Sequence, residues 1–336
     1  MTTPSGQISA QDIKNEFGEV NGTVPLGSYR VSQTRGALTL AIGDGVPTSG
    51  TISYDNMRNK QLNIVVDFFS GGGINRTDNG DNATNAKHIY NTNNSKVTVV
   101  GQLKSKPSNT SGHRVRIHVN KTIGGKKGGS TVCAFRTGAG WNAGTNLSVD
   151  IGGSGKIYGG GGDGGEGGNT DDDGNDGQNG ASALGIQYNG TTVNVSSGGL
   201  IQCGFGGGGG GGSGRQQDKG GDRRAGGGGG GGGQGFPGGS GGDRGRGEEG
   251  ATDGSAGDLT EAGEGGGGGN HANQAYGASG GEGGSLGEAA NDGGNSNRSG
   301  GNGGAQGSAI RKASGVSFTL NNSGTINGNT NQTGVT

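Results

Sequence analysis

Residues 204–307 contain long glycine runs, among them 206–212 and 226–233, that alternate with short charged or aromatic interruptions. Glycine has no side chain to bury, and it loses more conformational freedom on folding than any other residue. A conventional side-chain core therefore cannot form in this stretch. Two outcomes remain open: a flexible low-complexity tail, or a structure in which extended backbones pack directly on one another.

The composition of the whole chain excludes several other classes. Of the 336 residues, 91 are glycine and only 5 are proline, and the glycines fall in runs instead of at every third position, which excludes collagen. The formal charge is −1, so no net charge favours nucleic acid. Cys133 and Cys203 lie far apart and indicate neither a disulfide framework nor a zinc site. Without a signal-peptide pattern or an apolar run of about 18 residues, we expect synthesis in a cytoplasm.

The first 60 residues contain one short motif twice, as Ser-Gly-Gln-Ile-Ser at 5–9 and Ser-Gly-Thr-Ile-Ser at 49–53. Each copy leads into a short helical pattern, because Ser9 and Ser53 are residues that cap the amino end of a helix. This module, with Asp-Ile-Lys-Asn-Glu-Phe-Gly after the first copy and Val-Pro-Thr before the second, resembles segments of tail and tail-fibre proteins of tailed bacteriophages. The resemblance implies that residues 1–60 attach the chain to other phage tail proteins.

Residues 61–158 are predicted to form a β-rich domain. The apolar run at 62–69 indicates a buried strand, and residues 113–119 alternate between apolar side chains and Arg or His, as in a half-solvated sheet. Further short strands are expected at 96–100 and 132–135.

Catalytic and metal-binding patterns are not evident. His88, His113 and His118 are typical of sheet surfaces and loops, and His113 and His118 are spaced so that in a strand they point to opposite faces. No carboxylate pair, HExxH motif or P-loop order is present. We therefore predict that the protein is not an enzyme and has neither a metal site nor a cofactor.

A strand, turn, strand pattern recurs three times and frames the glycine runs. One such unit cannot bury its apolar side chains alone, so we expect the copies to stack as a small coil or sheet. Glycine-rich inserts at 159–313, with returning strands at about 184–203, would leave and re-enter this stack, and residues 314–336 would close it. The copies are Leu147-x-Val149 with Gly155-Lys-Ile157, Val193-x-Val195 with Gly199-Leu-Ile201, and Phe318-x-Leu320 with Gly324-Thr-Ile326.

The glycine runs are predicted to form extended left-handed helices of the polyproline II type, with about three residues per turn, whose backbones hydrogen-bond to one another. An even number of helices returns the chain to its starting side. Loops at the far end are expected at 215–224, 248–262 and 289–299, base turns at 236–237 and 270–276, and an acidic tip at 169–178 in the first insert. The six helices expected in the second insert are 204–214, 225–235, 238–247, 263–269, 277–287 and 300–307.

Residues 145–336 show a further resemblance. A strand repeat with Gly-x-Ile, glycine runs, Gly-x-Ala-Ile and a final Asn-Ser-Gly-Thr-Ile-Asn-Gly is similar to the glycine-rich tips of phage tail fibres. That resemblance implies a mainly β protein with an inserted bundle of polyglycine type II helices. It also implies an adhesin, located in the virion tail after assembly in the host cytoplasm, whose distal loops bind a bacterial surface receptor, either lipopolysaccharide or an outer-membrane protein.

Candidate receptor contacts are the polar residues of the expected tip loops. Arginine and glutamine suit the phosphates and hydroxyl groups of bacterial surface glycans, because a guanidinium group binds an oxyanion through paired hydrogen bonds. The candidates are Arg215, Gln216, Gln217, Lys219, Arg223, Arg224, Glu248, Glu249, Asp253, Asn295 and Arg298.

Three alternatives stay open at this point. The chain could be a structural tail protein without adhesive function, an antifreeze or surface-coat protein built on the same bundle, or a disordered RNA-binding tract around residues 244–247. The long charged loops argue against ice binding, and the balancing acids and lack of interleaved aromatic residues argue against RNA. Fibre geometry makes a homotrimer plausible, although no heptad pattern indicates one.

Overall fold

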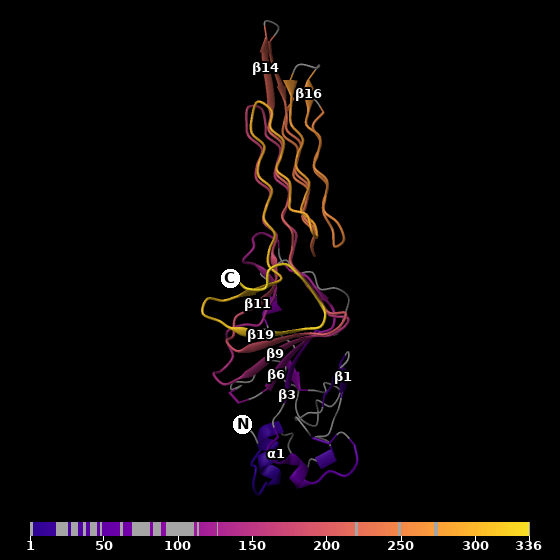
Figure 1. The fold of residues 1–336 in the computed structure, drawn as a ribbon, viewed down its shortest axis with the longest axis vertical. Helices are drawn as coiled ribbons and strands as arrows, with labels where there is room; N and C mark the ends of the chain where they lie inside the picture. Colours follow the sequence, from indigo (N-terminus) through magenta and orange to yellow (C-terminus); the bar gives the residue numbers. More distant parts are fainter. Residues whose placement is uncertain are drawn as a thin grey trace.

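The computed structural model describes residues 3–17, 26–27, 33–35, 38–40, 46–47, 49–60, 63–68, 81–82, 89–91, 111–112, 114–125, 127–218, 221–247, 250–271 and 275–335. The molecule is elongated (Figure 1): helix α1 lies at one end, a stack of strands occupies the middle, and the glycine-rich segments extend to the other end. Among the described residues, no helix has the length and apolar character needed to cross a membrane.

Both copies of the N-terminal motif lead into helical turns, as predicted. Helix α1 (Ala10–Phe17) follows Ser9, whose N–H donates to a carboxylate oxygen of Asp12 at 2.8 Å. The second copy leads into a short 3₁₀ helix, η2 (Tyr54–Met57). Thr3 joins the start of the module to its end, because its hydroxyl donates to the Met57 carbonyl at 2.5 Å. A small hairpin, β1 (Gln33–Arg35) with β2 (Leu38–Leu40), lies between the copies in sequence.

The middle of the chain is a three-sided parallel β-helix, in which the strands from β6 (Arg114–Val119) onward, apart from those of the glycine-rich inserts, join three sheets in turn. Strand β5 is antiparallel to β3, and the other pairs within these three sheets are parallel. The six-stranded sheet holds β19 (Phe318–Asn322), β12 (Thr191–Val195), β9 (Asn146–Ile151), β6 (Arg114–Val119), β3 (Asn63–Phe68) and β5 (Ile89–Asn91). The four-stranded sheet holds β20 (Thr325–Asn327), β13 (Leu200–Gln202), β10 (Lys156–Tyr158) and β7 (Thr122–Ile123). The five-stranded sheet holds β21 (Gln332–Thr333), β18 (Ile310–Lys312), β11 (Ser182–Ile186), β8 (Cys133–Arg136) and β4 (Asp81–Asn82).

The interior of the β-helix is made by equivalent residues of successive coils. Ile123, Ile157 and Ile201 are paired in register in the four-stranded sheet, and all three are fully buried. Because alternate residues of a strand face the same side, one apolar residue in two is enough to fill this core. Both glycine-rich inserts leave the β-helix at the same corner, since one joins β10 to β11 and the other joins β13 to β18.

The three-copy repeat is confirmed as a stack, but its register differs from the prediction in one place. Val193 pairs with Val149 on one side and Leu320 on the other, whereas the sequence pattern aligned Val193 with Leu147. The Gly-x-Ile part is in the predicted register, with Ile157, Ile201 and Ile326 side by side. Apolar residues alternate over six positions in β9, so the local pattern cannot choose between two registers that differ by two residues.

Three of the other expected strands are present and correspond to β3, β6 and β8. The strand expected at 96–100 lies outside the described residues, as do His88 and His113. His118 is only 1% exposed, although its alternating pattern predicted a solvated face. Its Nε2 lies 3.5 Å from a carboxylate oxygen of Asp150 on the neighbouring strand, so the strand pairing gives it a charged neighbour that the sequence of β6 does not reveal.

Burial by itself would raise the pKa of the Asp150 carboxyl, but the neighbouring His118 imidazole and a hydrogen bond from Asn194 outweigh that effect and lower it. The Asn194 amide donates to Asp150 Oδ1 at 2.6 Å. The polar side chains of His118, Asp150 and Asn194 therefore join neighbouring strands on the outer face of the six-stranded sheet.

The two inserts consist of extended segments joined by backbone hydrogen bonds. The bonds recur at every third residue: Gly165 donates to the Gly208 carbonyl at 2.9 Å, and Gly168 donates to the Gly211 carbonyl at 2.8 Å. This step is compatible with a helix of about three residues per turn. Within the described residues we distinguish segments 1 (159–168) and 2 (172–181) in the first insert, and 3 (204–213), 4 (226–235), 5 (238–247), 6 (251–258), 7 (263–269), 8 (277–284), 9 (289–294) and 10 (300–307) in the second.

The backbone bonds arrange these segments in three layers. One outer layer holds segments 2, 1 and 5, the middle layer holds 10, 3, 4 and 6, and the other outer layer holds 9, 8 and 7. Segment 3 is bonded to segments 1, 2, 4, 8, 9 and 10, and segment 4 to segments 1, 3, 5, 6, 7 and 8. These two segments are therefore surrounded by backbone on every side.

The number of neighbours explains the glycine pattern. Segments 3 and 4 carry side chains only near their ends, at Phe205, Ser213 and Gln234, because a Cβ elsewhere would collide with a neighbouring backbone. Segment 6 has three neighbours and needs glycine only at Gly254 and Gly257, where the missing Cβ would face segment 4. The two longest glycine runs therefore mark the centre of the bundle, and an outer segment such as segment 6 needs glycine only at every third position.

The prediction of six extended helices in the second insert was wrong, since this insert contains segments 3 to 10. Residues 251–258 and 289–294 were expected to be parts of loops, yet both form extended segments. They are poor in glycine because they lie on the outside, so the search for glycine runs missed them.

Candidate functional site

The end of the bundle remote from the β-helix, here called the tip, is formed by the turns that join alternate segments. Strands β14 (Gly214–Asp218) and β15 (Gly221–Ala225) form a hairpin between segments 3 and 4. Strands β16 (Asn270–His271) and β17 (Ala275–Tyr276) form a second hairpin between segments 7 and 8. Figure 1 shows β14 and β16 together at this end. The tip also contains residues 169–171, 250 and 295–299.

The predicted tip hairpin at 215–224 and the predicted base turn at Phe236 and Pro237 are in the expected places. The base turn contacts the β-helix, because Gly125 donates to the Phe236 carbonyl at 3.0 Å. The assignment of 270–276 to the base was wrong, and so was the assignment of all of 248–262 to the tip. Each segment that was not recognised reverses the direction of the chain. Because segment 6 runs from the tip to the base, the next turn, at 259–262, lies at the base.

The acidic part of the first insert also has a different role from the one predicted. Only residues 169–171 turn at the tip, and the following residues descend in segment 2. Asp173, Asp176 and Asn179 accept hydrogen bonds from backbone N–H groups of residues 299, 302 and 305 at 2.9, 2.6 and 2.7 Å. At this edge of the bundle, side-chain oxygens satisfy amides that have no facing carbonyl.

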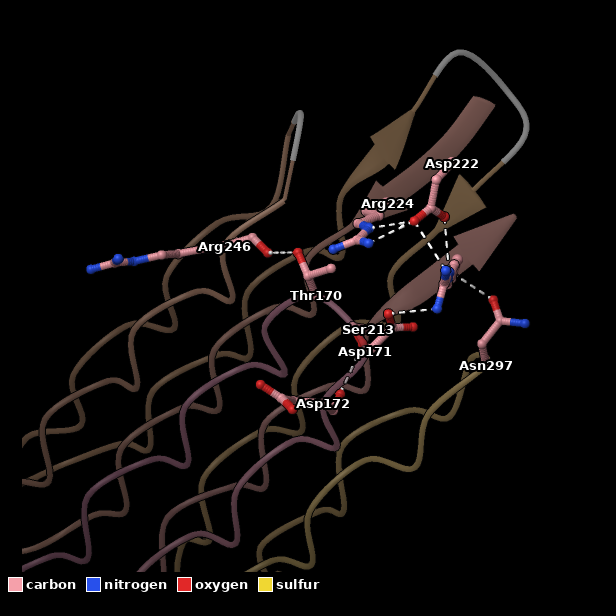
Figure 2. Close-up of polar contacts among 9 residues, drawn as sticks. Thr170, Asp171, Asp172, Ser213, Asp222, Arg224, Arg246 and Asn297 are labelled. Atoms are coloured by element: carbon pink, nitrogen blue, oxygen red, sulfur yellow. Dashed lines mark hydrogen bonds and ion pairs between the residues drawn. The ribbon is translucent and has the colours of Figure 1, made fainter. Parts of the chain in front are cut away.

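Ion pairs hold the β14–β15 hairpin on the bundle. Arg215 donates to Asp222 at 2.8 Å and to Asp171 of the first insert at 2.8 Å. Arg224 donates to the same Asp222 at 2.6 Å, and Figure 2 shows these two side chains facing each other. Hydrogen bonds from Arg215 and then Arg224 hold the pKa of the Asp222 carboxyl below its ordinary value. The guanidinium groups of Arg215 and Arg224 are therefore already engaged within the tip.

The remaining sequence-predicted contact residues divide into three groups. Gln216 and Gln217 are exposed on β14, and Arg223 is half-buried on β15. Asp253 lies exposed near the start of segment 6, and Asn295 and Arg298 lie exposed in the tip turn at 295–299. Lys219, Glu248 and Glu249 lie outside the described residues.

The backbone bonds bring Arg298 to the hairpin, because its N–H donates to the Ser213 carbonyl at 3.2 Å. Asn295 and Asp253 each accept a backbone N–H, from Gly300 at 2.7 Å and from Arg244 at 2.9 Å. These two side chains therefore shape their own turns, in addition to being exposed.

Two further tip residues were missed from sequence. Tyr276 is 51% exposed at the end of β17, and Asn297 accepts the N–H of Arg215 at 2.7 Å. Tyr276 was missed because its hairpin had been assigned to the base. The glycines at 254 and 257, three residues apart, were the signal that could have revealed segment 6 and corrected the direction of every later turn.

Metal binding and cysteine-based catalysis have little support in the described part of the chain. It contains no group of three or more His, Cys, Asp or Glu residues placed to hold a metal ion. Cys133 and Cys203 are buried and unpaired, and burial raises the pKa of the two thiols to about 12 and about 11. Both therefore stay protonated at neutral pH and are poor nucleophiles. The absence of a cofactor and of enzymatic activity stays a prediction.

The molecule has a small module at one end, a β-helix in the middle and a bundle of extended segments at the other end. This arrangement is that of a fibre protein that presents loops at its far end. The family model described as phage tail fibre adhesin Gp38 matches residues 82–331, which is more than half of the chain. The chain belongs to this family. It is therefore a receptor-binding adhesin of the phage tail, which the resemblance of residues 145–336 had implied.

One solved structure also resembles the chain, the crystal structure of the gp37–gp38 adhesin tip complex of the bacteriophage S16 long tail fibre. Sequence identity is 21%, the match covers 85% of this chain and 90% of that one, and the TM-score is 0.40. No curated protein sequence matches this chain.

Proposed function

We propose that the tip is the face that binds the bacterial surface receptor. The supporting observation is that turns from both inserts meet at the end of the molecule farthest from the N-terminal module (Figure 1). The β14–β15 hairpin presents the exposed Gln216 and Gln217 there, with Arg223 beside them. Exposed amide and guanidinium groups can bind the hydroxyl and phosphate groups of lipopolysaccharide or the polar loops of an outer-membrane protein.

The glycine segments are proposed to be polyglycine type II helices that form a rigid support for this face. The step of three residues between successive backbone bonds supports this assignment. Rigidity matters because loops ordered before binding lose less entropy when they meet a receptor. Replacement of Gly208, discussed below, tests the close packing that this arrangement requires.

Exchange of the hairpin side chains tests the receptor face. A phage carrying Gln216→Ala, Gln217→Ala and Arg223→Ala together should bind host cells about tenfold more weakly or worse, since a loss of about 1.4 kcal/mol of binding energy is a factor of ten in affinity. Adsorption is measured from free phage remaining in host culture. The control is Thr260→Ala with Glu261→Ala, two exposed residues of a base turn. Equal adsorption of the hairpin variant and the wild type would contradict a receptor face at the tip.

The N-terminal module is proposed to attach the chain to other phage tail proteins, because α1 lies at the opposite end from the tip (Figure 1). Gln7→Cys and Gln216→Cys place a reactive thiol at each end, and the two native thiols are buried. After gold labelling of each variant phage, electron microscopy should show the label at position 7 next to the tail fibre and the label at 216 beyond it. The reverse order would reject the proposed attachment.

A further inference from the structure

A cavity of about 700 Å³ lies beside the tip between segments 5 and 6. Its volume falls in the range of roughly 300–1,000 Å³ that is usual for small-molecule sites. Segment 5 contributes residues 243–247, segment 6 contributes 251–253, and Gly226 and Gly250 complete the lining. Of the sequence-predicted receptor contacts that the structure describes, Asp253 alone belongs to the lining.

The cavity exists because the close packing of segments 5 and 6 stops at Arg244. Nearer the base, Gly257 donates to the Gly239 carbonyl and Gly254 to the Gly242 carbonyl, both at 2.9 Å. A Cβ at Gly238 or Gly241 would collide with the carbonyls of Gly257 and Gly254. Arg244 is the next residue in this three-residue series and carries a Cβ. Here the side chain of Asp253, instead of a backbone carbonyl, accepts the Arg244 N–H at 2.9 Å.

Hydrogen bonds hold the backbone around the cavity, while the long side chains of Arg244 and Arg246 project from that backbone. The N–H of Arg246 donates to Asn169 Oδ1 at 2.8 Å, and its carbonyl accepts the Thr170 hydroxyl at 3.4 Å. Figure 2 shows the Arg246 side chain extending away from the Arg224–Asp222 network. Among the described residues, neither Arg244 nor Arg246 pairs with a carboxylate, unlike Arg215 and Arg224.

The lining combines two kinds of polar group. Arg244 and Arg246 supply guanidinium groups, which bind oxyanions through paired hydrogen bonds. Asp243, Asp253 and the Thr252 hydroxyl supply acceptors for the hydroxyl groups of a ligand. All five side chains are exposed, and the only apolar side chain in the lining is that of Ala251. A ligand that satisfies both kinds needs one acidic group and several hydroxyl groups.

We propose that this cavity binds an acidic sugar, that is, a sugar unit bearing a phosphate or a carboxylate, of the bacterial surface. The acid group contacts Arg244 and Arg246, and the sugar hydroxyl groups contact Asp243, Asp253 and Thr252. The biological role rests on the proposed function of the tip, whereas binding of the sugar by the isolated protein does not. The cavity would then add a glycan contact beside the contacts made by the β14–β15 hairpin.

Titration of the purified full chain with small probes tests the inference. The probes are glucose 6-phosphate, glucuronate, glucose and inorganic phosphate, followed by calorimetry or ligand-observed NMR. At least one acidic sugar should bind more tightly than both glucose and inorganic phosphate. Arg244→Gln with Arg246→Gln should weaken that binding about tenfold or more, the loss expected when charge-assisted hydrogen bonds are removed. Lys156→Gln with Lys312→Gln, on strands β10 and β18 of the β-helix, removes the same charge and should change nothing.

The outcomes separate this inference from the proposed function. Preference for the phosphorylated probe would indicate phosphorylated core sugars as the source, and preference for glucuronate would indicate uronic acids. Equal binding of glucose, equal binding of inorganic phosphate, or unchanged affinity in a folded Arg244→Gln, Arg246→Gln variant would overturn the inference. Loss of adsorption in the hairpin variant would still support the receptor face in that case.

Discussion

Replacement of Gly208 by alanine is expected to destabilise the glycine bundle by about 3 kcal/mol or more, at the upper end of the usual penalty for overpacking. Gly208 lies in segment 3, and a Cβ at this position would collide with the carbonyl of Gly281 in segment 8. Gly208 also accepts a bond from Gly165 at 2.9 Å and donates to the Gly231 carbonyl at 2.8 Å. The clash cannot be relieved by one side chain, because every atom around it is backbone held in a regular ladder.

Gly267→Ala is the matched control, since it makes the same substitution at the edge of the same bundle. Within the described part of the chain, the only atom within 4 Å of a Cβ at Gly267 is Thr252 Oγ1, at 3.7 Å, an ordinary van der Waals distance. This variant should therefore be as stable as the wild type, or slightly more stable because alanine restricts the unfolded chain. Urea unfolding of the three proteins measures the difference. Similar midpoints for Gly208→Ala and Gly267→Ala would show that the glycine runs are not closely packed.

Replacement of Phe135 by alanine should cost about 3–5 kcal/mol, the usual range for a large buried aromatic residue. Phe135 is fully buried in β8 and pairs with Leu184 of β11, which in turn pairs with Ile310 of β18. These three residues come from three coils of the β-helix, and the last two follow the two glycine inserts. A cavity at Phe135 would therefore weaken the strands to which both inserts return.

Phe318→Ala makes the same substitution on the terminal strand β19, where the side chain is only partly buried. It should cost clearly less than Phe135→Ala, because a half-exposed site loses less packing and leaves a smaller cavity. Thermal unfolding followed by circular dichroism compares the two variants with the wild type. An equal loss of stability would argue that the β-helix is not the cooperative core of the molecule.

Several local features were predictable because neighbouring residues determine them. The helix start at Ser9 depends on side chains that reach backbone groups three residues away. The continuous apolar run at 62–69 identified β3, and alternation of apolar and polar residues identified β6. The Gly-x-Ile spacing gave the correct register of the four-stranded sheet. The family could also be predicted, because the strand repeat and the glycine runs are a linear pattern, and the family model, which matches residues 82–331, includes most of that pattern.

Other features depend on contacts that are distant in sequence. His118 is buried next to Asp150 only because β6 pairs with β9. Arg215 and Arg224 are of a residue type that suits receptor contacts, yet both form ion pairs within the tip. Arg215 pairs with Asp171, and Arg224 pairs with Asp222. The position of the exposed Tyr276 at the tip and the cavity at Arg244 could not be predicted from sequence, because both depend on the direction in which each segment runs.

The sequence by itself determined that the chain has a repeating β stack, that glycine backbones replace a side-chain core in the inserts, and that charged interruptions mark turns. Only the tertiary structure decided how many segments the bundle contains and which turns reach the tip. The physical reason is that a residue's need to be glycine depends on how many neighbours surround its segment. Segments 3 and 4 each have six bonded neighbours, and their sequences are almost entirely glycine. Segments 6 and 9 each have three bonded neighbours, and their sequences resemble those of ordinary polar loops.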